Sequence, residues 1–447
     1  MAEARGWPQV LIVFVLGMTL PACRSMAPDG QSMAAATHIY SEETTAGVAV
    51  GSAPYEAELT MREAVRRAIR YSPALGAATA ELDAKDAEAL QAGARRNPQL
   101  ESEIENFGGT GDLQGFKSAE TTIGLAQVIE LRGKRLKRLE VAQLDVALSG
   151  WDYEAVRLKV AAQSALYFID VMASQERRTI LGEFVTLSTR FRSSVADRVK
   201  AGKVSAVELR RAEVELARAK VRLAEERAGL DAARRKLALQ WGSQSPNFGS
   251  AAGSLKASDN LPDGDRLRRH LARHPDVARW AEEMARRETI HRLALAQGVP
   301  DLTLGAGVRQ LEETQDTAVV AKVGIDLPIF NRNRGNAEAA ERRIAKGEFQ
   351  RQAARNALMT QFVEAFGQLK VAEAKLRALR IEVIPAATAA YEATDKGYSD
   401  GKFDLLRLID AQRALVESRI DIIDTRAAFH KARTRVEALI GGSLYRL

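Results

Sequence analysis

Cysteine and histidine are scarce in this chain, and their scarcity excludes several kinds of site. Among 447 residues only Cys23 is a cysteine, so neither a disulfide within the chain nor a cluster of thiolate metal ligands is possible. The five histidines show no ligand spacing paired with acids: His270 and His274 flank a predicted helix start and lack a carboxylate partner. Nucleotide-binding loops, nucleophile elbows and zinc-protease motifs are also missing. We therefore expect no enzyme, no metal site and no cofactor.

Aromatic residues make up only 6% of the chain, while hydrophobic residues make up 46% and charged residues 28%. These proportions are those of a folded protein, and the abundance of Ala, Arg, Leu and Glu favours long helices. The net charge of +7 comes from 65 basic and 58 acidic residues that alternate along predicted helical faces. This pattern indicates an ion-paired surface, so nucleic acid is not an expected partner.

The longest apolar run, Val10 to Leu20, is too short to cross a membrane as a helix and is typical of a secretory signal. It is followed by Pro21-Ala22-Cys23, and this ending resembles a bacterial lipoprotein signal, in which the cysteine is acylated and becomes the first mature residue. The alternative is an ordinary signal peptide with an incidental cysteine. We expect a signal peptide over 1–22 and a lipid-anchored tether over 23–57, with Arg24 pointing to the outer membrane.

The rest of the sequence repeats itself at a spacing of about 200 residues. Ser72-Pro73 corresponds to His274-Pro275, 202 positions later, and Gly202-Lys203 corresponds to Gly401-Lys402, 199 positions later. We expect two tandem repeats over 58–242 and 263–447, joined by a Gly-, Ser- and Pro-rich linker over 243–262. Each repeat is predicted to contain one helix, two strands and two further long helices. The predicted helices are 60–96, 133–199, 203–240, 264–297, 335–396 and 403–440, and the predicted strands are 99–107, 120–129, 301–311 and 318–329.

The predicted strands alternate between apolar and polar residues. Leu100 and Ile104 oppose three glutamates in the first strand. In the last strand Lys322 and Asp326 lie opposite a face made of Val319, Ala321, Val323, Ile325 and Leu327. About ten alternating residues is the length with which a strand crosses an outer membrane, although an amphipathic hairpin on a soluble helical protein has the same pattern. Four strands cannot close a barrel, so membrane-spanning strands require several chains: two supply eight strands and three supply twelve.

Four segments resemble the TolC-type outer-membrane efflux family. The sharpest match is Tyr391 to Arg413, and Phe191 to Glu213 is its weaker copy in the first repeat. Glu130 to Arg135 and Pro328 to Gly335 resemble the strand-to-helix junctions of the heavy-metal branch, of the cobalt–zinc–cadmium and copper–silver resistance type. The resemblance extends over nearly all of residues 58–442.

The resemblance implies a mainly α protein with a small membrane β-barrel part. Three chains would form a twelve-stranded barrel in the outer membrane, continued by an α-helical tunnel through the periplasm. The partners would be a periplasmic adaptor and an inner-membrane pump of the resistance–nodulation–division class, and this chain would be the passive exit duct for heavy-metal cations. The alternatives are a duct for organic compounds and, from another class, a periplasmic coiled-coil scaffold.

The resemblance also suggests residues at the periplasmic end of the tunnel. Gly202-Lys203 and Gly401-Lys402 lie where each repeat turns between its two long helices, and glycine suits the end of a helix. Asp410 matches an aspartate of the acidic ring that narrows the pore in this family. Arg407 stands where a second acid often occurs, so we expect it to pair with Asp410 of the same helix or with a neighbouring chain. The alternative for Asp410 is a surface aspartate in an ion-paired helix.

Overall fold

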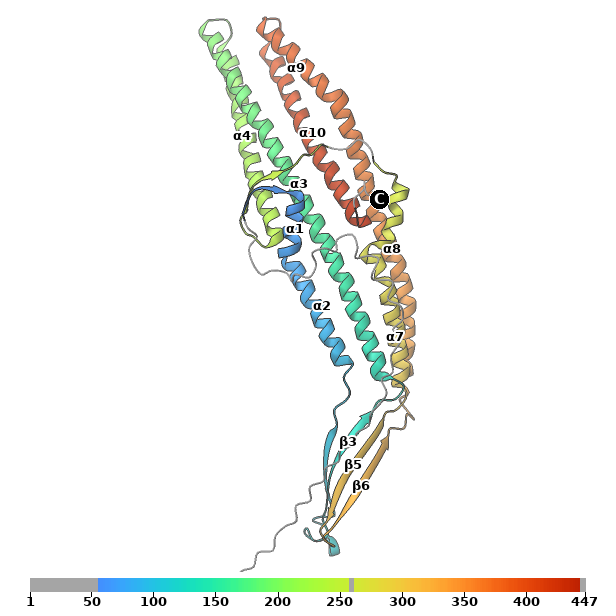
Figure 1. Ribbon diagram of the computed structural model, residues 1–447. Helices are drawn as coiled ribbons and strands as arrows, with labels where there is room; N and C mark the ends of the chain where they lie inside the picture. The colour runs from blue at the N-terminus through green and yellow to red at the C-terminus, as the bar shows by residue number, and fades with distance from the viewer. Residues whose placement is uncertain (1–54, 257–260, 443–447) are drawn as a thin grey trace, which may run out of the picture. The chain divides into compact units, whose positions relative to one another are not determined.

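The computed structural model describes residues 55–256 and 261–442, all of which lie in one compact unit (Figure 1). The predicted signal peptide, Cys23 and most of the predicted tether lie outside the described residues. The helices are α1 Met61–Tyr71, α2 Pro73–Ala92, α3 Lys134–Lys200, α4 Ala206–Ala238, α5 Gly264–Arg268, α6 Pro275–Ala278, α7 Trp280–Gln297, α8 Arg334–Ala378, α9 Ile384–Ser399 and α10 Leu405–Ile440. The strands are β1 Glu56–Thr60, β2 Gln99–Glu105, β3 Glu120–Ile129, β4 Phe248–Ala252, β5 Leu302–Leu311 and β6 Asp316–Ile325.

Two predicted single helices are interrupted by proline. The helix expected over 60–96 is divided into α1 and α2 at Ser72-Pro73, and the helix expected over 264–297 breaks at His274-Pro275. Ser72 and His274 have extended backbone angles, with ψ at 123° and 137°, because the ring of a following proline disfavours the helical region. Each proline then starts a new helix, where its missing N–H costs nothing.

The long helix expected over 335–396 contains one widened turn. Residues Leu379–Val383 form a π-helical turn between α8 and α9, immediately before Pro385. Proline has no N–H to donate and its ring crowds the preceding turn, and one extra residue in that turn accommodates both effects. The chain therefore continues as α9 with a local change of helical phase.

The helices pack around α3, which contacts α2, α7, α4 and α10. In Figure 1, α3 runs between α2 on one side and α7 and α8 on the other. One large core cluster includes Phe168 of α3 and Trp241 after α4; another lies between α8 and α10 and includes Phe362, Phe366 and Phe429. Burial of these side chains is the main term that holds the long helices side by side.

A small parallel sheet lies in segments where no strand was expected. Strand β4 falls within the predicted linker 243–262, and β1 begins inside the predicted tether 23–57. Leu59 of β1 and Phe248 of β4 are fully buried in the core around Trp241. The side chain of Gln175 on α3 supports β4, since it bonds both the N–H and the carbonyl oxygen of Ala251, at 2.8 and 2.9 Å.

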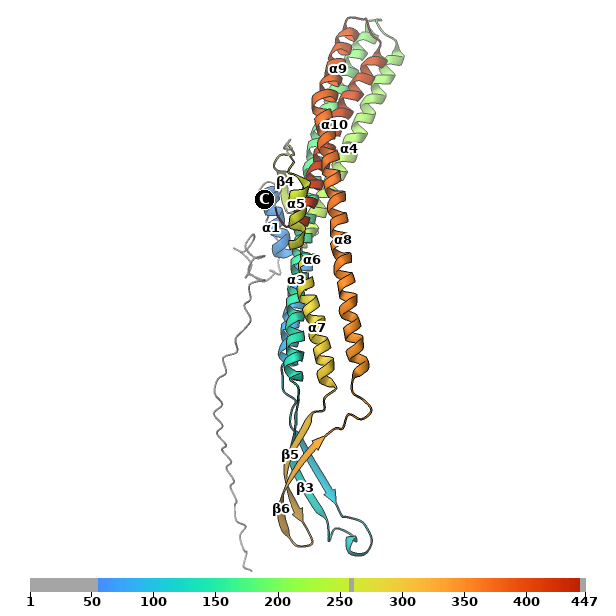
Figure 2. The ribbon, with the colours of Figure 1, turned by 90° about the vertical axis from the view of Figure 1, so that its right-hand side faces the viewer.

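The second sheet has four antiparallel strands in the order β2-β3-β5-β6. Figure 2 shows these strands beyond the ends of α3, α7 and α8. Their bounds agree closely with the predicted strands. The central pair, β3 and β5, is in register over ten residues from Glu120↔Leu311 to Ile129↔Leu302, so the two hairpins form one continuous sheet.

Phe429 tests the packing of α8 against α10. Its side chain is fully buried, so Phe429→Ala leaves a cavity that the neighbouring helices cannot fill. We expect a loss of about 3–5 kcal/mol in the free energy of unfolding, measured by denaturant titration of the detergent-solubilised protein. Leu295→Ala is the control, because Leu295 is 56% exposed, and a loss of similar size in both variants would contradict this account.

Candidate functional site

The four-stranded sheet has one polar face. Residues directly opposite each other on paired strands lie on the same face of the sheet, so the strand register alone assigns each residue to a face. Glu103, Thr122 and Arg309 form one row of this face, and Glu105 and Glu120 belong to the next. The polar face carries five carboxylates and two cations, an excess of three negative charges: Glu101, Glu103, Glu105, Glu120, Asp316, Arg309 and Lys322.

Both cations of the polar face are paired across strands. The Arg309 guanidinium lies 2.5 Å from Glu120 and 3.0 Å from Glu105, and it also donates to the Thr122 hydroxyl at 2.9 Å. Lys322 donates to Glu101 at 3.0 Å. In the described part of the chain Glu103 makes no ion pair. The sequence alone could not show these pairs, because they depend on the register between strands about 200 residues apart.

The middle of the polar face is lined by backbone rather than by side chains. Gly124 of β3 and Gly307 of β5 stand opposite each other. A Cβ atom added at Gly307 would lie 2.7 Å from the carbonyl oxygen of Ile123, so no larger residue fits at the present strand spacing. Glycine therefore keeps this part of the face open above the strands.

The other face of the sheet is apolar, as the alternation predicted. Ser102, Ile123, Val308 and Val319 form one row. Several apolar side chains of this face are well exposed in the single chain, among them Leu100 at 74%, Val319 at 86% and Val323 at 73%. A contiguous exposed apolar surface of this kind marks a contact with lipid or protein.

Strands β2 and β6 are the edges of this sheet. In the described residues β2 pairs only with β3, and β6 only with β5. Each edge therefore carries a row of backbone N–H and C=O groups without a strand partner. We also find no helix in the described residues with an apolar stretch sufficient for a membrane span.

A buried ion pair joins the sheet to the helices. Lys134, at the start of α3, donates to the carbonyl oxygen of Val299 and to Asp301 Oδ1, both at 2.6 Å. The backbone N–H of Leu131 donates to the same Asp301 oxygen at 3.2 Å. Lys134 is only 7% exposed, and its hydrogen bonds compensate for the loss of water around its charge. This contact fixes the end of β3 beside the beginning of β5.

Glu130 and Arg138 form a second ion pair at the same junction. Arg138 Nη2 donates to Glu130 Oε2 at 2.9 Å, and the other arms of the two side chains are also in contact. Hydrogen bonding to Arg138 holds the pKa of Glu130 below its ordinary value of 4.5, although burial opposes the shift. The pair holds the beginning of α3 against the end of β3.

The two predicted Gly-Lys turns are built alike. Gly202 follows α3 and Gly401 follows α9, with φ of +68° and +76°. In each, the lysine N–H reaches back into the helix: Lys203 donates to Arg198 O at 2.9 Å and Lys402 donates to Gly397 O at 2.8 Å. Both turns are the left-handed glycine ending of a helix.

Arg198 connects the two turns. Its guanidinium, on α3, donates to the carbonyl oxygen of Ser399 at 3.1 Å, near the end of α9. The same group lies 4.7 Å from the centre of the Tyr398 ring. A cation near the C-terminal carbonyls of a helix is favourable, so Arg198 holds α9 against α3.

Arg407 and Asp410 are both exposed on α10. Arg407 does not pair with Asp410 within the chain, as one expectation had it. Its Nε lies 3.9 Å from Asp404, whose carboxylate also accepts the Arg407 backbone N–H at 3.2 Å as the N-cap of α10. The N-cap position fixes the Asp404 carboxylate near Arg407, which explains the different partner.

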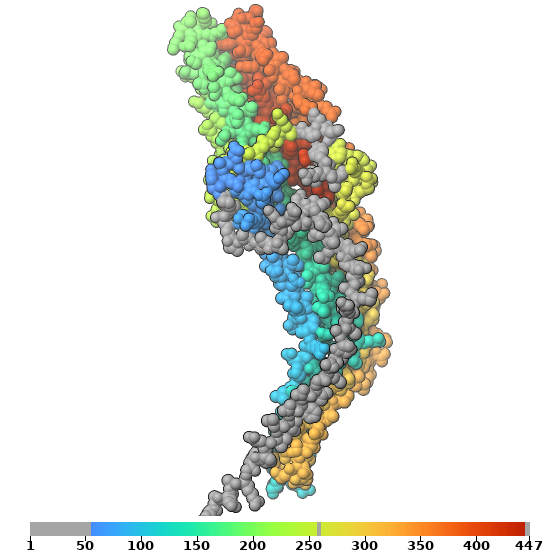
Figure 3. Space-filling view, in the orientation of Figure 1, coloured from blue at the N-terminus to red at the C-terminus, as the bar shows by residue number. Residues whose placement is uncertain are grey.

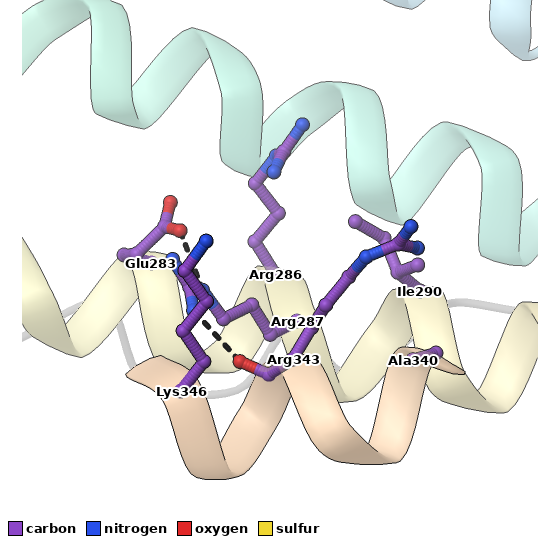
Figure 4. Close-up of a pocket in the computed structure, with 7 residues that line it drawn as sticks. All are labelled: Glu283, Arg286, Arg287, Ile290, Ala340, Arg343 and Lys346. Atoms are coloured by element: carbon purple, nitrogen blue, oxygen red, sulfur yellow. Dashed lines mark hydrogen bonds and ion pairs between the residues drawn. The ribbon is translucent and has the colours of Figure 1, made fainter. Parts of the chain in front are cut away.

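The histidines in the described part of the chain form no metal site. Contrary to expectation, His274 has a carboxylate neighbour, Asp276 at 3.7 Å. Its ring nitrogen accepts the Asp276 N–H, however, and so caps α6. Within residues 55–256 and 261–442 no group of three or more His, Cys, Asp or Glu side chains could hold a metal ion. A cavity of about 290 Å³ between α7 and α8 is instead lined mainly by cations (Figure 4). Its charged residues are Glu283, Arg286, Arg287, Arg343 and Lys346.

A two-faced sheet continued by long paired helices defines a class of outer-membrane efflux channels. The chain belongs to the outer membrane efflux protein family, whose profile matches residues 64–243 and 267–442. The resemblance drawn from the sequence motifs is thereby confirmed.

Curated relatives place the chain more closely. It is 32% identical to the cobalt-zinc-cadmium resistance protein CzcC of Cupriavidus metallidurans, over 86% of this chain and 90% of that protein. It is 27% identical to the nickel and cobalt resistance protein CnrC of the same organism, over 64% of this chain and 67% of the relative. The crystal structure of CusC has the same fold, with a TM-score of 0.71 at 18% identity, covering 94% of this chain and all of that one.

Glu130 makes the stability of the junction depend on pH. Because the native pKa is below the unfolded value, the unfolded chain binds more protons in this range, and stability falls as the pH drops from about 4.5 through the native pKa. We expect Glu130→Gln to flatten this acid limb in thermal unfolding measured at several pH values. Glu183→Gln is the control, since its carboxylate is 60% exposed and 3.7 Å from Arg419. An unchanged acid limb in Glu130→Gln would contradict the assignment.

Proposed function

We propose that three copies of this chain form a twelve-stranded barrel across the outer membrane and a helical tunnel in the periplasm. The assembly is the passive exit duct for heavy-metal cations in a system with a periplasmic adaptor and an inner-membrane resistance–nodulation–division pump. The observation that carries this proposal is the two-faced sheet with two open edges. An apolar face suits lipid, and lipid offers no partner for the unpaired edges of β2 and β6, so the sheet must close with other chains.

Three chains supply enough strands both to close a barrel and to leave a pore for transport. Eight strands would leave an interior filled largely by side chains, whereas twelve leave room for a water-filled pore. The polar face then lines the pore, and its excess of three negative charges becomes nine in a trimer. A pore lined with carboxylates concentrates cations.

Metal export is supported by the relatives. CzcC and CnrC are named for resistance to cobalt, zinc, cadmium and nickel, and CzcC is matched over nearly its full length. Because the described residues offer no cluster of metal ligands, cations pass by electrostatic attraction and the pump makes the selection. The duct itself needs no cofactor.

The two Gly-Lys turns are the proposed periplasmic tip and the surface that meets the adaptor. Gly202, Lys203, Gly401 and Lys402 are exposed, and Arg198 holds their two helices together. Asp410 is exposed in the second helical turn of α10, eight residues after Lys402, so three copies can converge on the axis as an acidic ring. In this arrangement Arg407 remains with Asp404 and leaves the Asp410 carboxylate available to cations.

Two further parts of the proposal concern the chain as a whole. The similar order of helices and strands in 58–242 and 263–447 supports a tandem duplication, with the linker between them contributing β4. An acyl group on Cys23 would anchor the protein in the outer membrane, with no catalytic or metal role.

Glu103 tests the pore lining. Glu103, like Asp316, is a polar-face carboxylate that makes no ion pair in the described chain, so Glu103→Gln removes three uncompensated charges from a trimer. We expect the permeability ratio of cations to anions, measured for single channels in a planar bilayer, to fall. Ser102→Ala, the adjacent residue on the apolar face, is the control and should leave the ratio unchanged. Equal ratios in wild type and Glu103→Gln would contradict a pore-lining position.

A deletion strain tests the substrate class. Removing the gene should make the bacterium more sensitive to zinc, cobalt and cadmium, and expression of the intact chain should restore growth. Sensitivity to organic toxins, measured in the same strain, should not change. A strain sensitive only to organic compounds would instead establish the duct for organic compounds.

A further inference from the structure

Next to the four-stranded sheet, the helices form a row that follows the strands. α2 packs on α3, α3 on α7 and α7 on α8, the order in which β2, β3, β5 and β6 lie in the sheet. In Figure 3, α2 forms one margin of this row and α7 and α8 form the other. The outer helices, α2 and the first half of α8, each have one covered and one uncovered side.

The uncovered side of α2 is smooth and acidic. Its buried residues, Leu75 and Ala89, lie on the opposite side. The exposed residues at intervals of three and four are alanines: Ala77, Ala80, Ala84 and Ala87. Between positions 81 and 88 the helix carries four carboxylates against one lysine: Glu81, Asp83, Asp86, Glu88 and Lys85.

The uncovered side of α8 carries a large aromatic residue beside two cations. Ala340 and Gly347 face α7, whereas Phe349 is 79% exposed on the other side of the helix. Arg342 lies two turns before Phe349 on the same side, at the coiled-coil spacing of seven. Lys346 also lies within about 60° of Phe349 around the helix, whereas Arg343, Arg351 and Arg355 lie about 120° or more from it and belong to other sides. Arg342 is 3.7 Å from Glu338 of its own helix.

Contacts between neighbouring helices of the row place the uncovered sides of α2 and α8 at the same level along the helix axes. Leu75 shares a core cluster with Val160, against which Val156 packs, and Gly93 lies beside Leu139. Leu82 of α2 therefore lies near the middle of this stretch of α3. Arg279 and Arg286 of α7 pair with Asp152 and Asp145 in this same stretch.

The last step of the row is from α7 to α8. A Cβ atom at Gly347 would meet the Met284 sulfur, which places residues 347–349 of α8 beside Met284. Because Met284 lies between Arg279 and Arg286 along α7, Phe349 is at the level of Glu81 to Ala84. The directions also agree, since α2 leads into β2 and α8 leads away from β6, and the two helices are therefore antiparallel.

We propose that α8 of one chain packs on α2 of a second copy, with Phe349 inserted between Ala80 and Ala84. Phe349 is large, the opposing groove is lined by methyl groups, and Arg342 and Lys346 beside Phe349 face the carboxylates of α2. Antiparallel packing at this register brings Arg342 of one chain opposite Glu88 of the next. The inference rests on the proposed trimer and names the surface that closes its helical part, in continuity with the open edges of β2 and β6.

Cysteine cross-linking tests this seam. Phe349 and either Ala80 or Ala84 are replaced by cysteine in one chain; α3 and α7 separate the two positions within a chain, so a disulfide can form only between chains. On oxidation of the detergent-solubilised protein, at least one of the two pairs should give a covalent trimer on a non-reducing gel. Reduction should return the monomer. Failure of both pairs to cross-link would overturn the seam.

Matched variants test whether cross-linking depends on the proposed face of α8. Glu348→Cys combined with Ala84→Cys shifts the thiol by about 100° around α8 and should cross-link little; linkage equal to that of Phe349→Cys would overturn the proposed helix face. The single cysteine variants, which retain Cys23, measure the background. Native mass of the unoxidised protein separates the two hypotheses: a trimer without cross-links contradicts the seam alone, whereas a monomer or dimer contradicts the proposed trimer.

A charge reversal gives a second readout. Arg342→Glu should weaken the trimer in dilute detergent, measured as the fraction of trimer by native mass, and adding Glu88→Arg should restore it. Because Arg342 is largely exposed in the single chain, neither change disturbs the core. Equal weakening in the single and double variants would contradict the pairing of the two helices.

Discussion

The pairing of β3 with β5 is the interaction on which the rest of this structure depends. It joins two hairpins from distant parts of the chain in an unbroken register of ten residues. That register decides which side chains share a face, and thus separates carboxylates from aliphatic residues. It also sets the sequence of helices beyond the strands, because α3 and α7 continue from the paired strands and are fixed there by Lys134 and Asp301. The order of the strands in the sheet consequently determines the order of the helices beyond it.

The long helices depend on this arrangement because few of them could be stable alone. Their exposed faces are highly charged, and their buried faces consist largely of alanine, serine and leucine, with aromatic residues concentrated in a few clusters. Contact with a neighbouring helix therefore supplies most of the stabilisation. The same reasoning applies to the proposed contact between α2 and α8 of neighbouring copies.

Sequence reasoning predicted elements whose signal is local and failed for contacts that depend on register. The four long strands were recognised because their alternation is regular, and the Gly-Lys turns because glycine at positive φ ends both helices. Helix lengths were overestimated at Pro73 and Pro275, where the apolar periodicity continues across the break. β1 and β4 were missed because each has only five residues, and β4 also lies in Gly- and Ser-rich sequence. The Lys134–Asp301 pair and the Arg309 cluster had no signal at all, since their members are 167 or more residues apart.

The π turn between α8 and α9 has a consequence for the spacing of residues along the whole helix. One additional residue in a turn rotates everything beyond it by roughly 100° relative to an uninterrupted helix. Positions before Leu379 and after Val383 that share a heptad phase in the sequence therefore point in different directions. The turn changes the helical phase, so that one continuous segment can pack against two sets of neighbours. The number of residues between Phe349 and Tyr391 therefore matters for this packing as much as the identity of the residues. A single-residue deletion there would leave every other side chain unchanged and still misalign one end of the helix.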